Sequence, residues 1–338
     1  MSHDWAQWLP MICGAVVAIA IFMYVMLDGF DLGVGLLMPM ADGEDQRETM
    51  MNSVAPFWDG NETWLVLGGG GLLATFPLAF ATLLPGLYGP VMLMLFALVF
   101  RGVAFEFRFK AQKKGRRVWD CCFWLGSSLA ALAQGVMLGA FVQGFTLDAQ
   151  GHIVGTPWLT WFCLFTGIGL ACGYALLGAC WLVLKAEGPL QARALLAARV
   201  LAFGLIIFIV GVSLWTPITQ PEIAQRWFSL PNFLYLSQVP LFTAFLAGAL
   251  LWSLHKRHQL MPFLCTIGLF LMSYLGLAVS LWPYTVPRVL TLWDTAAAPE
   301  SQGFLLVGVV IFLPLVLFYT AFSFWVFRGK VRRHAGYE

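Results

Sequence analysis

The chain has 338 residues, of which 60% are hydrophobic and 11% are charged, and its formal net charge is +2. A soluble globular protein carries about 25% charged residues, so the composition excludes that class and indicates a helical protein embedded in lipid. An outer-membrane β-barrel is excluded as well, because the apolar runs are long and continuous, whereas barrel strands alternate over ~10 residues. Nothing in the composition points to a nucleic-acid partner.

About nine apolar runs reach the length of ~20 residues that crosses a bilayer as a helix. The first run has no basic residues before it and no clear small-residue cleavage site after it, so we expect it to stay in the mature protein. The expected spans are Leu9–Gly29 (with a continuation to Met40 left open), Pro56–Leu83, Leu87–Phe109, Val118–Val142, Trp158–Leu184, Val200–Leu214, Leu234–Leu254, Pro262–Leu281 and Phe304–Phe327. They predict an all-α polytopic membrane protein in which residues 1–338 form a single integral membrane domain.

The connections between these spans alternate in charge. The basic ones hold Arg47, then Arg108, Lys110, Lys113, Lys114, Arg116 and Arg117, then Lys185 and Arg193, then Lys256 and Arg257, and finally the tail from Arg328 onward. The intervening connections contain only Arg226 and Arg288. Basic loops mark the cytoplasmic side, so nine spans predict a periplasmic amino terminus and a cytoplasmic carboxyl terminus.

Acidic residues gather in the first two spans. Asp28 and Asp31 are three residues apart in the first span and therefore share a helix face, and Asp59 and Glu62 repeat that spacing in the second. One interpretation is that Asp59 and Glu62 are only helix-end residues near the headgroups, favoured by the positive end of the helix. Those two residues taken alone leave this alternative open.

The third span adds Arg101 and Glu106, which lie about 140° apart around a helix and so need partners on other helices. The alternating direction of the spans places all six ionisable groups toward the cytoplasmic ends of their helices. Arg101 lies deeper than a headgroup contact, and ionisable residues within a membrane are candidates for function. We therefore expect a polar pocket that opens to the cytoplasm and suits proton uptake, although an ion-coupled transporter would use the same groups.

The five histidines, by contrast, avoid the span interiors. They lie in loops, in tails or at span ends, at His3, His152, His255, His258 and His334. Because histidine is the usual axial ligand of membrane haem, we expect this chain to bind no haem and no metal. Glycines are expected to serve packing: Gly29 and Gly33 allow close helix approach, and the quartet at 68–71 packs or softens the second span.

Three motifs in the first half carry a family resemblance: "LDGFDLGVGLL", "NSVAPFWDGNETWL" and "VFRGVAFEFRFK". In this order they resemble subunit II of the cytochrome bd-type quinol oxidases, including the cyanide-insensitive branch. Downstream, "WPYTVPRVLTLWDTAAAP" and "LPLVLFYTAFSFWVFRGKV" resemble the last loop and last span of that family. Residues 145–260 match only in hydropathy.

This resemblance implies two four-helix bundles, at residues 1–145 and 146–285, followed by a periplasmic loop, a peripheral last helix and a basic cytoplasmic tail at 286–338. It implies a bacterial inner-membrane location and a partner, subunit I, that carries two b-type haems, one d-type haem and the quinol-oxidising loop. A small single-helix accessory subunit is a further partner that the family leaves open. Whether a quinone or lipid binds structurally to this chain is also open.

The resemblance further implies that this non-haem subunit supports assembly and supplies a proton path for reduction of O2 to water, with no catalytic residue of its own. The expected proton-entry residues are Trp58 and Asp59 in the second span, with Arg101 and Glu106 in the third. Glu62, Asp28 and Asp31 are the other candidates. The alternatives are a stand-alone proton- or cation-coupled permease, which predicts broken helices in both halves, and a scaffold whose acids only neutralise Arg101.

Overall fold

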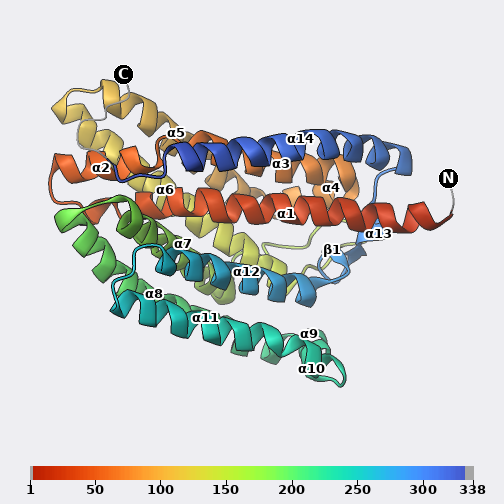
Figure 1. Cartoon of the computed structure of the whole chain (residues 1–338). Helices are drawn as coiled ribbons and strands as arrows, with labels where there is room; N and C mark the ends of the chain where they lie inside the picture. Colours follow the sequence, from red (N-terminus) through yellow and green to blue (C-terminus); the bar gives the residue numbers. More distant parts are fainter. Residues whose placement is uncertain (1–2, 332–338) are drawn as a thin grey trace.

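The computed structural model describes residues 3–331, apart from the side chains of residues 3–6, 113 and 114, and nearly all of it is helical (Figure 1). The long helices run side by side along one direction. The two ends of the described chain lie at opposite ends of this bundle, as an odd number of crossings requires (Figure 1).

The first half of the chain supplies α1 (His3–Leu36), the 3-10 helix η1 (Met38–Met40), α2 (Glu44–Val54), α3 (Trp58–Thr75), α4 (Pro77–Gly86), α5 (Tyr88–Lys110) and α6 (Lys113–Gln143). The second half supplies α7 (Trp161–Lys185), α8 (Gly188–Thr219), α9 (Pro221–Phe228), α10 (Asn232–Leu236), α11 (Gln238–His255), α12 (Met261–Leu281), β1 (Tyr284–Val286), β2 (Leu290–Thr291), α13 (Leu292–Thr295) and α14 (Pro299–Val326). Strands β1 and β2 pair antiparallel as a short hairpin.

Eight helices within the described residues are long and apolar enough to cross a membrane, and the consecutive pair α3 and α4 makes a ninth if it is counted as one span. The prediction of a polytopic helical membrane protein with about nine spans is therefore confirmed at this level. Some spans are longer than the apolar runs suggested: α8 covers Gly188–Thr219, whereas the expected span was Val200–Leu214. Polar and small residues at the helix ends extend the helix beyond its hydrophobic centre.

The expected span over Pro56–Leu83 is divided into α3 and α4, which meet at an angle of 119°, and the break does not lie at the glycine quartet. Proline disfavours the helical conformation of the residue before it, and Phe76, which precedes Pro77, has φ −135° and ψ 60°. The glycine quartet at 68–71 lies within α3 and does not break it. The Thr75 carbonyl at the break accepts hydrogen bonds from the Ala297 N–H, just before α14, at 2.9 Å and from Gln302 Nε2, in α14, at 3.0 Å.

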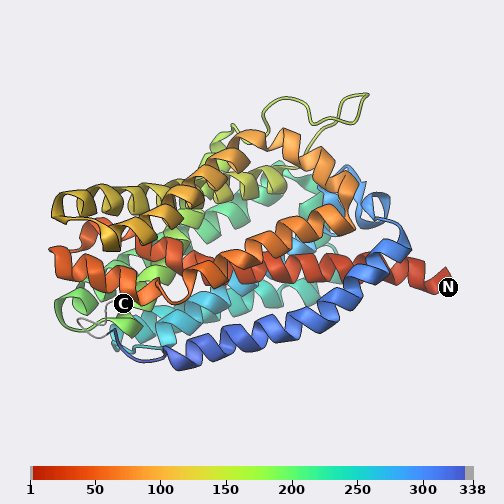
Figure 2. The ribbon, with the colours of Figure 1, turned by 90° about the horizontal axis from the view of Figure 1, so that it is seen from above.

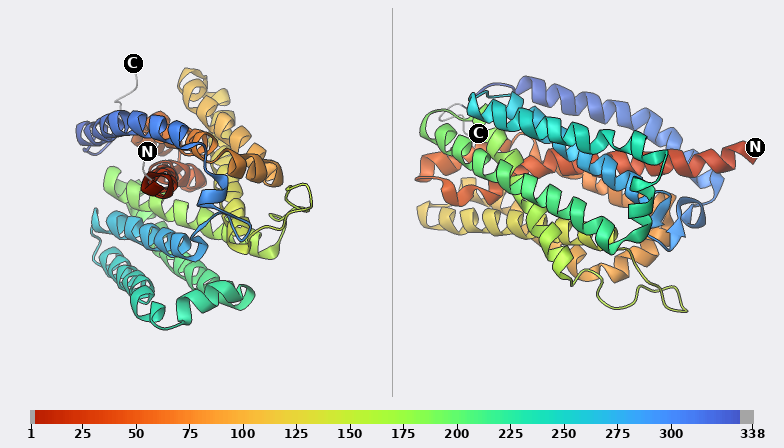
Figure 3. Two further views of the ribbon diagram at one scale, coloured as in Figure 1. Left: turned by 90° about the vertical axis from the view of Figure 1, so that its right-hand side faces the viewer. Right: turned by 90° about the horizontal axis from the view of Figure 1, so that it is seen from below.

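Helix α1 lies in the middle of the bundle, where it packs against α3, α6, α7 and α14 (Figures 1 and 3). Its closest approach is to α7: a Cβ atom added to Gly33 would lie 1.8 Å from the Tyr174 carbonyl oxygen and 2.8 Å from the Gly178 nitrogen. Gly29 faces the Tyr174 ring in the same way. The predicted close helix approach at Gly29 and Gly33 is confirmed.

The second half packs α7 against α8 and α11 against α12, with a core of small and aliphatic residues that includes Ala198, Ala202, Leu250 and Leu269. Figure 2 shows α14 along one side of the molecule and the loop after α6 projecting away from the bundle. The basic connection that holds α2 lies at the opposite end from the β1–β2 hairpin and α13 (Figure 1). The candidate site lies toward the α2 end of the bundle.

Candidate functional site

Arg101 on α5 forms the centre of a buried charge cluster. Its side chain has no exposed surface, and it joins three helices. Its Nη1 donates to Asp28 Oδ1 on α1 at 2.7 Å, and its Nη2 donates to Glu62 Oε2 on α3 at 3.0 Å. A guanidinium group can bind two carboxylates at once because its donors are held in a rigid fork. The expectation that Arg101 finds partners on other helices is confirmed.

Asp31 completes the cluster on the same face of α1. It is fully buried, and its Oδ2 accepts a hydrogen bond from Asn61 Nδ2 on α3 at 2.7 Å. The same Asn61 nitrogen also lies 3.2 Å from the Leu27 carbonyl oxygen. Among the described residues, Asp31 has no cationic partner within ion-pair distance.

Trp58 lies over the cluster from the first turn of α3. Its ring is 5.7 Å from the Arg101 guanidinium carbon and stacks on Phe105 at 5.0 Å with an interplanar angle of 5°. The ring also covers Gly102, where an added Cβ would lie 3.4 Å from it. An aromatic face next to a guanidinium group stabilises the charge and keeps water away from it. Trp58 therefore shields Arg101.

Asp59 and Glu106 lie outside the cluster. Asp59 is exposed in the first turn of α3, whereas Glu62 reaches inward one turn later. Glu106 is 66% exposed, and its ion-pair contact is Lys110 on its own helix at 4.0 Å. The expectation that Glu106 finds a partner on another helix is therefore wrong, because the face of α5 opposite to Arg101 points away from the bundle.

The cluster continues inward through polar residues that sequence analysis did not identify. Tyr174 on α7 donates its hydroxyl hydrogen to Gln134 Oε1 on α6 at 2.8 Å, and Gln134 Nε2 donates to the Tyr24 hydroxyl on α1 at 2.8 Å. Tyr24 lies one helical turn from Asp28 on the same face. An uncharged Tyr or Gln in an apolar run is a weak signal, and only the packing of three helices brings these residues together.

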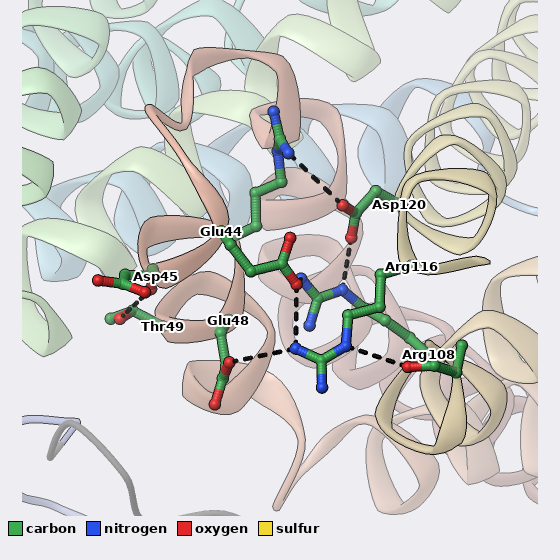
Figure 4. Close-up of polar contacts among 9 residues, drawn as sticks. Glu44, Asp45, Glu48, Thr49, Arg108, Arg116 and Asp120 are labelled. Carbon is green, nitrogen blue, oxygen red and sulfur yellow. Dashed lines mark hydrogen bonds and ion pairs between the residues drawn. The ribbon is translucent and has the colours of Figure 1, made fainter. Parts of the chain in front are cut away.

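A second ion-pair network lies nearer to the end of the bundle (Figure 4). Arg108 on α5 is almost fully buried between Asp120 Oδ1 on α6 at 2.5 Å and Glu44 Oε1 on α2 at 3.0 Å. Arg116 reaches the same Glu44 oxygen at 3.2 Å. This network holds α2 against the α5–α6 hairpin, so part of the basic charge in that connection is structural.

We expect Arg108→Gln to loosen α2, because it leaves Asp120 without its main partner in a nearly dry site. The free energy of unfolding should fall by about 3 kcal/mol, the scale for losing one partner of a buried pair. The measurement is thermal denaturation of the purified complex together with limited proteolysis between residues 41 and 57. The exposed Arg117 provides the control, since Arg117→Gln should change neither result. Equal stability and equal cleavage of the two variants would contradict a role of Arg108 in holding α2 against the α5–α6 hairpin.

Haem or metal ligation finds little support in this part of the chain. His152 lies in the loop after α6, His255 is the last residue of α11, and His258 lies in the turn that follows. No group of three or more His, Cys, Asp or Glu side chains suited to a metal ion occurs within residues whose positions are described. His3 and His334 are outside the described side chains. Each of these three described histidines therefore lies outside the interior of a span.

Fold and site together define a multi-pass helical membrane protein with a carboxylate–arginine cluster buried near one end of its bundle. Residues 9–327 match the family model described as cytochrome bd terminal oxidase subunit II. The chain belongs to this family, and it is therefore a subunit of a cytochrome bd-type quinol oxidase, an oxidoreductase complex that contains haem and a partner subunit I. The predicted family resemblance is confirmed.

Individual relatives agree with this family assignment. Subunit 2 of the cytochrome bd-I ubiquinol oxidase of Escherichia coli K12 is 26% identical over 369 residues, covering 94% of both chains. Subunit 2 of the cytochrome bd ubiquinol oxidase of Bacillus subtilis is 34% identical over 183 residues, covering 53% of this chain and 54% of that one. The solved bd oxidase of Geobacillus thermodenitrificans superimposes with a TM-score of 0.71 at 17% identity, covering 94% of this chain and 99% of that one, which shows a shared fold.

Membership of a subunit family argues against a stand-alone permease. That alternative also predicted broken helices in both halves, whereas α3 with α4 is the one bent pair of apolar helices in residues 3–331.

Proposed function

We propose that this chain is the non-haem subunit of a quinol:O2 oxidoreductase in the bacterial inner membrane, and that it supplies protons from the cytoplasm for reduction of O2 to water. The two b-type haems, the d-type haem and the quinol site would all belong to subunit I. The positions of the described histidines support this division. In this arrangement the chain also supports assembly by presenting its outer helix faces to subunit I.

The observation that carries the proposal is the Arg101 cluster, in which Asp28, Glu62 and Asp31 lie close to one cation in an otherwise apolar bundle. Buried charges are costly, and a membrane protein retains them where they move ions or protons. The basic connections lie at the same end as this cluster, which supports a cytoplasmic opening. A periplasmic amino terminus and a cytoplasmic tail follow from the same assignment.

In the proposed path, protons are collected at the surface by Asp59 and Glu106, both of which are exposed. Glu62 is the step into the protein, because its side chain is 27% exposed while it also contacts the fully buried Arg101. Trp58 excludes bulk water from Arg101, and Asp28 and Asp31 form the inner end. This path would deliver one proton at a time toward the O2-reducing site of the partner.

Two further parts of the family architecture belong to the same proposal. Helices α1 to α6 would form the first four-helix bundle and α7 to α12 the second, with α14 at the periphery. A single-helix accessory subunit and a structurally bound quinone or lipid would occupy faces that the described helices leave open to the membrane.

We expect Glu62→Gln to lower quinol-driven O2 consumption of the intact complex by about 100-fold, the lower end of the contribution of a positioned acid–base group. Glutamine can still accept the hydrogen bond from Arg101, so haem content and subunit stoichiometry should stay at the wild-type level. Turnover is measured with an oxygen electrode and proton uptake with a pH indicator inside proteoliposomes.

The matched control for this experiment is Glu300→Gln, which neutralises an exposed acid at the opposite end of the bundle. It should leave both rates unchanged. Wild-type turnover of an assembled Glu62→Gln complex would show that protons enter elsewhere, and loss of haem from that complex would favour the scaffold alternative.

A further inference from the structure

We infer that the two aspartates on one face of α1 have different protonation states: Asp28 is the permanent counter-ion of Arg101, whereas Asp31 is a neutral acid that holds an exchangeable proton. The role of that proton in turnover depends on the proposed function, but the assignment of the two states does not. The observations that carry it are the distribution of hydrogen-bond donors and the number of charges in the cluster.

The charges in the cluster do not balance if every acid is ionised. Asp28, Asp31 and Glu62 are three acids near a single cation, and both terminal nitrogens of Arg101 already bind Asp28 and Glu62. Its remaining nitrogen, Nε, is buried and has no partner among the described atoms. An ionised carboxylate without a cation in such a place costs several kcal/mol. The acid that lacks a cation is Asp31, and the excess negative charge disappears if Asp31 carries a proton.

The surroundings of Asp31 fit a neutral acid. Asn61 donates one hydrogen bond to Oδ2, and the buried Oδ1 has no partner among the described residues. A carboxylate has about four lone-pair sites to satisfy and can act only as an acceptor, so a single amide leaves it poorly solvated. A protonated Oδ1 needs fewer donors. The ionisable groups near it are Asp28 from α1, Glu62 from α3 and Arg101 from α5.

The surroundings of Asp28, by contrast, fit an anion. Besides the Arg101 bond at 2.7 Å, a chain of donors from α7 and α6 points toward it: Tyr174 donates to Gln134, and Gln134 donates to the Tyr24 oxygen. The Tyr24 hydrogen is then free to be donated to Asp28, which lies one turn along α1 and whose buried Oδ2 has no partner among the described atoms. Hydrogen bonds aligned in one direction polarise one another, so the chain supports negative charge on Asp28.

This donor chain supports Asp28 and does not conduct protons. An amide such as Gln134 can donate and accept a hydrogen bond, but it cannot pass a proton onward without changing its tautomer. The proton path therefore ends on α1. In turnover, Asp31 releases its proton toward O2 reduction in the partner subunit, and a proton from cytoplasmic water, arriving through Glu62, restores the acid.

The test makes the same substitution, aspartate to asparagine, at two positions of α1 and compares D31N with D28N in the intact complex. Asparagine resembles a neutral aspartic acid, so D31N should assemble to within about twofold of the wild-type yield and lose one protonated-carboxylic-acid C=O band in the infrared spectrum. D28N leaves Arg101 without its buried partner, so its yield should fall at least tenfold. Specific isotope labelling of aspartate identifies the band.

A carboxylic-acid band that persists unchanged in D31N would overturn the inference, as would a failure of D31N to assemble or a normal yield of D28N. The proposed proton path is tested separately by turnover. A D31N complex that lacks the band but reduces O2 at the wild-type rate would confirm the neutral state of Asp31 and contradict its place in the path. A band that persists in D31N while turnover is lost would contradict the neutral state of Asp31 and support its place in the path.

Discussion

Replacing Arg101 with glutamine is expected to prevent stable assembly of the complex. The change leaves Asp28 fully buried without its counter-ion, and it removes the contact that joins α1, α3 and α5. Removing one partner of a buried ion pair costs about 3–5 kcal/mol, which is a large part of the total stability of a typical domain. The measurement is the yield of haem-loaded complex after detergent extraction, together with its thermal denaturation.

The double variant Arg101→Gln with Asp28→Asn provides the control for charge balance. It removes both members of the pair, so no uncompensated charge remains on α1, and it should recover most of the lost stability. Equal stability of the single and double variants would show that lost packing, not the unpaired charge, causes the defect. A single variant as stable as the wild type would contradict the buried ion pair itself.

Gly33→Ala is the second substitution with a large expected effect. Its new methyl group would lie 1.8 Å from the Tyr174 carbonyl oxygen, which belongs to the backbone and cannot rotate away. Helices α1 and α7 would have to separate, and overpacking of this kind costs about 3 kcal/mol or more. We expect loss of the complex at the growth temperature, seen as absent haem bands and a lower denaturation midpoint of any material recovered.

The control for Gly33→Ala is Gly69→Ala, within the glycine quartet of α3. An added Cβ at Gly69 meets no atom within 4 Å, so this change should be neutral or should stabilise the helix by up to about 1 kcal/mol through its higher helix propensity. A tolerated Gly33→Ala would mean that the two helices are farther apart than the structure places them. The comparison separates a general effect of glycine replacement from the effect of close helix packing.

Much of the architecture follows from the sequence, because long apolar runs identify membrane-spanning helices directly. The expected Pro262–Leu281 span corresponds to α12, Met261–Leu281. The break in the second span was the main error. The four glycines suggested flexibility, whereas the bend occurs at Phe76 because of Pro77, a signal that the sequence contains and that the glycines obscured.

The site was only partly predictable. The spacing of Asp28 and Asp31 identified their shared face, and the depth of Arg101 identified its need for an acid. The sequence did not reveal which acids bind Arg101. Asp59 and Glu62 lie three residues apart near the start of the same helix, and in the structure Glu62, one turn farther along α3, contacts Arg101 while Asp59 lies exposed at the surface. This placement depends on how α3 packs against α1, which is not visible in the spacing of the two acids.

Residues without charge were the hardest to predict. Tyr24, Gln134 and Tyr174 come from three spans and become a set only after the helices pack. In a hydropathy plot each of them is only a small polar interruption of an apolar run. The hydrogen-bond chain that they form depends on the direction in which each side chain donates and accepts.

The contact between the last helix and the break in the second span also sets an order of events during synthesis. The Thr75 carbonyl, left without a helical partner by the bend, is satisfied by Ala297 and Gln302, which the ribosome makes more than 200 residues later. Until then this buried-end carbonyl lacks both hydrogen-bond donors, and an unsatisfied backbone carbonyl is costly. The hydrogen bonding of the break between α3 and α4 is therefore completed only after the start of the last helix has been made.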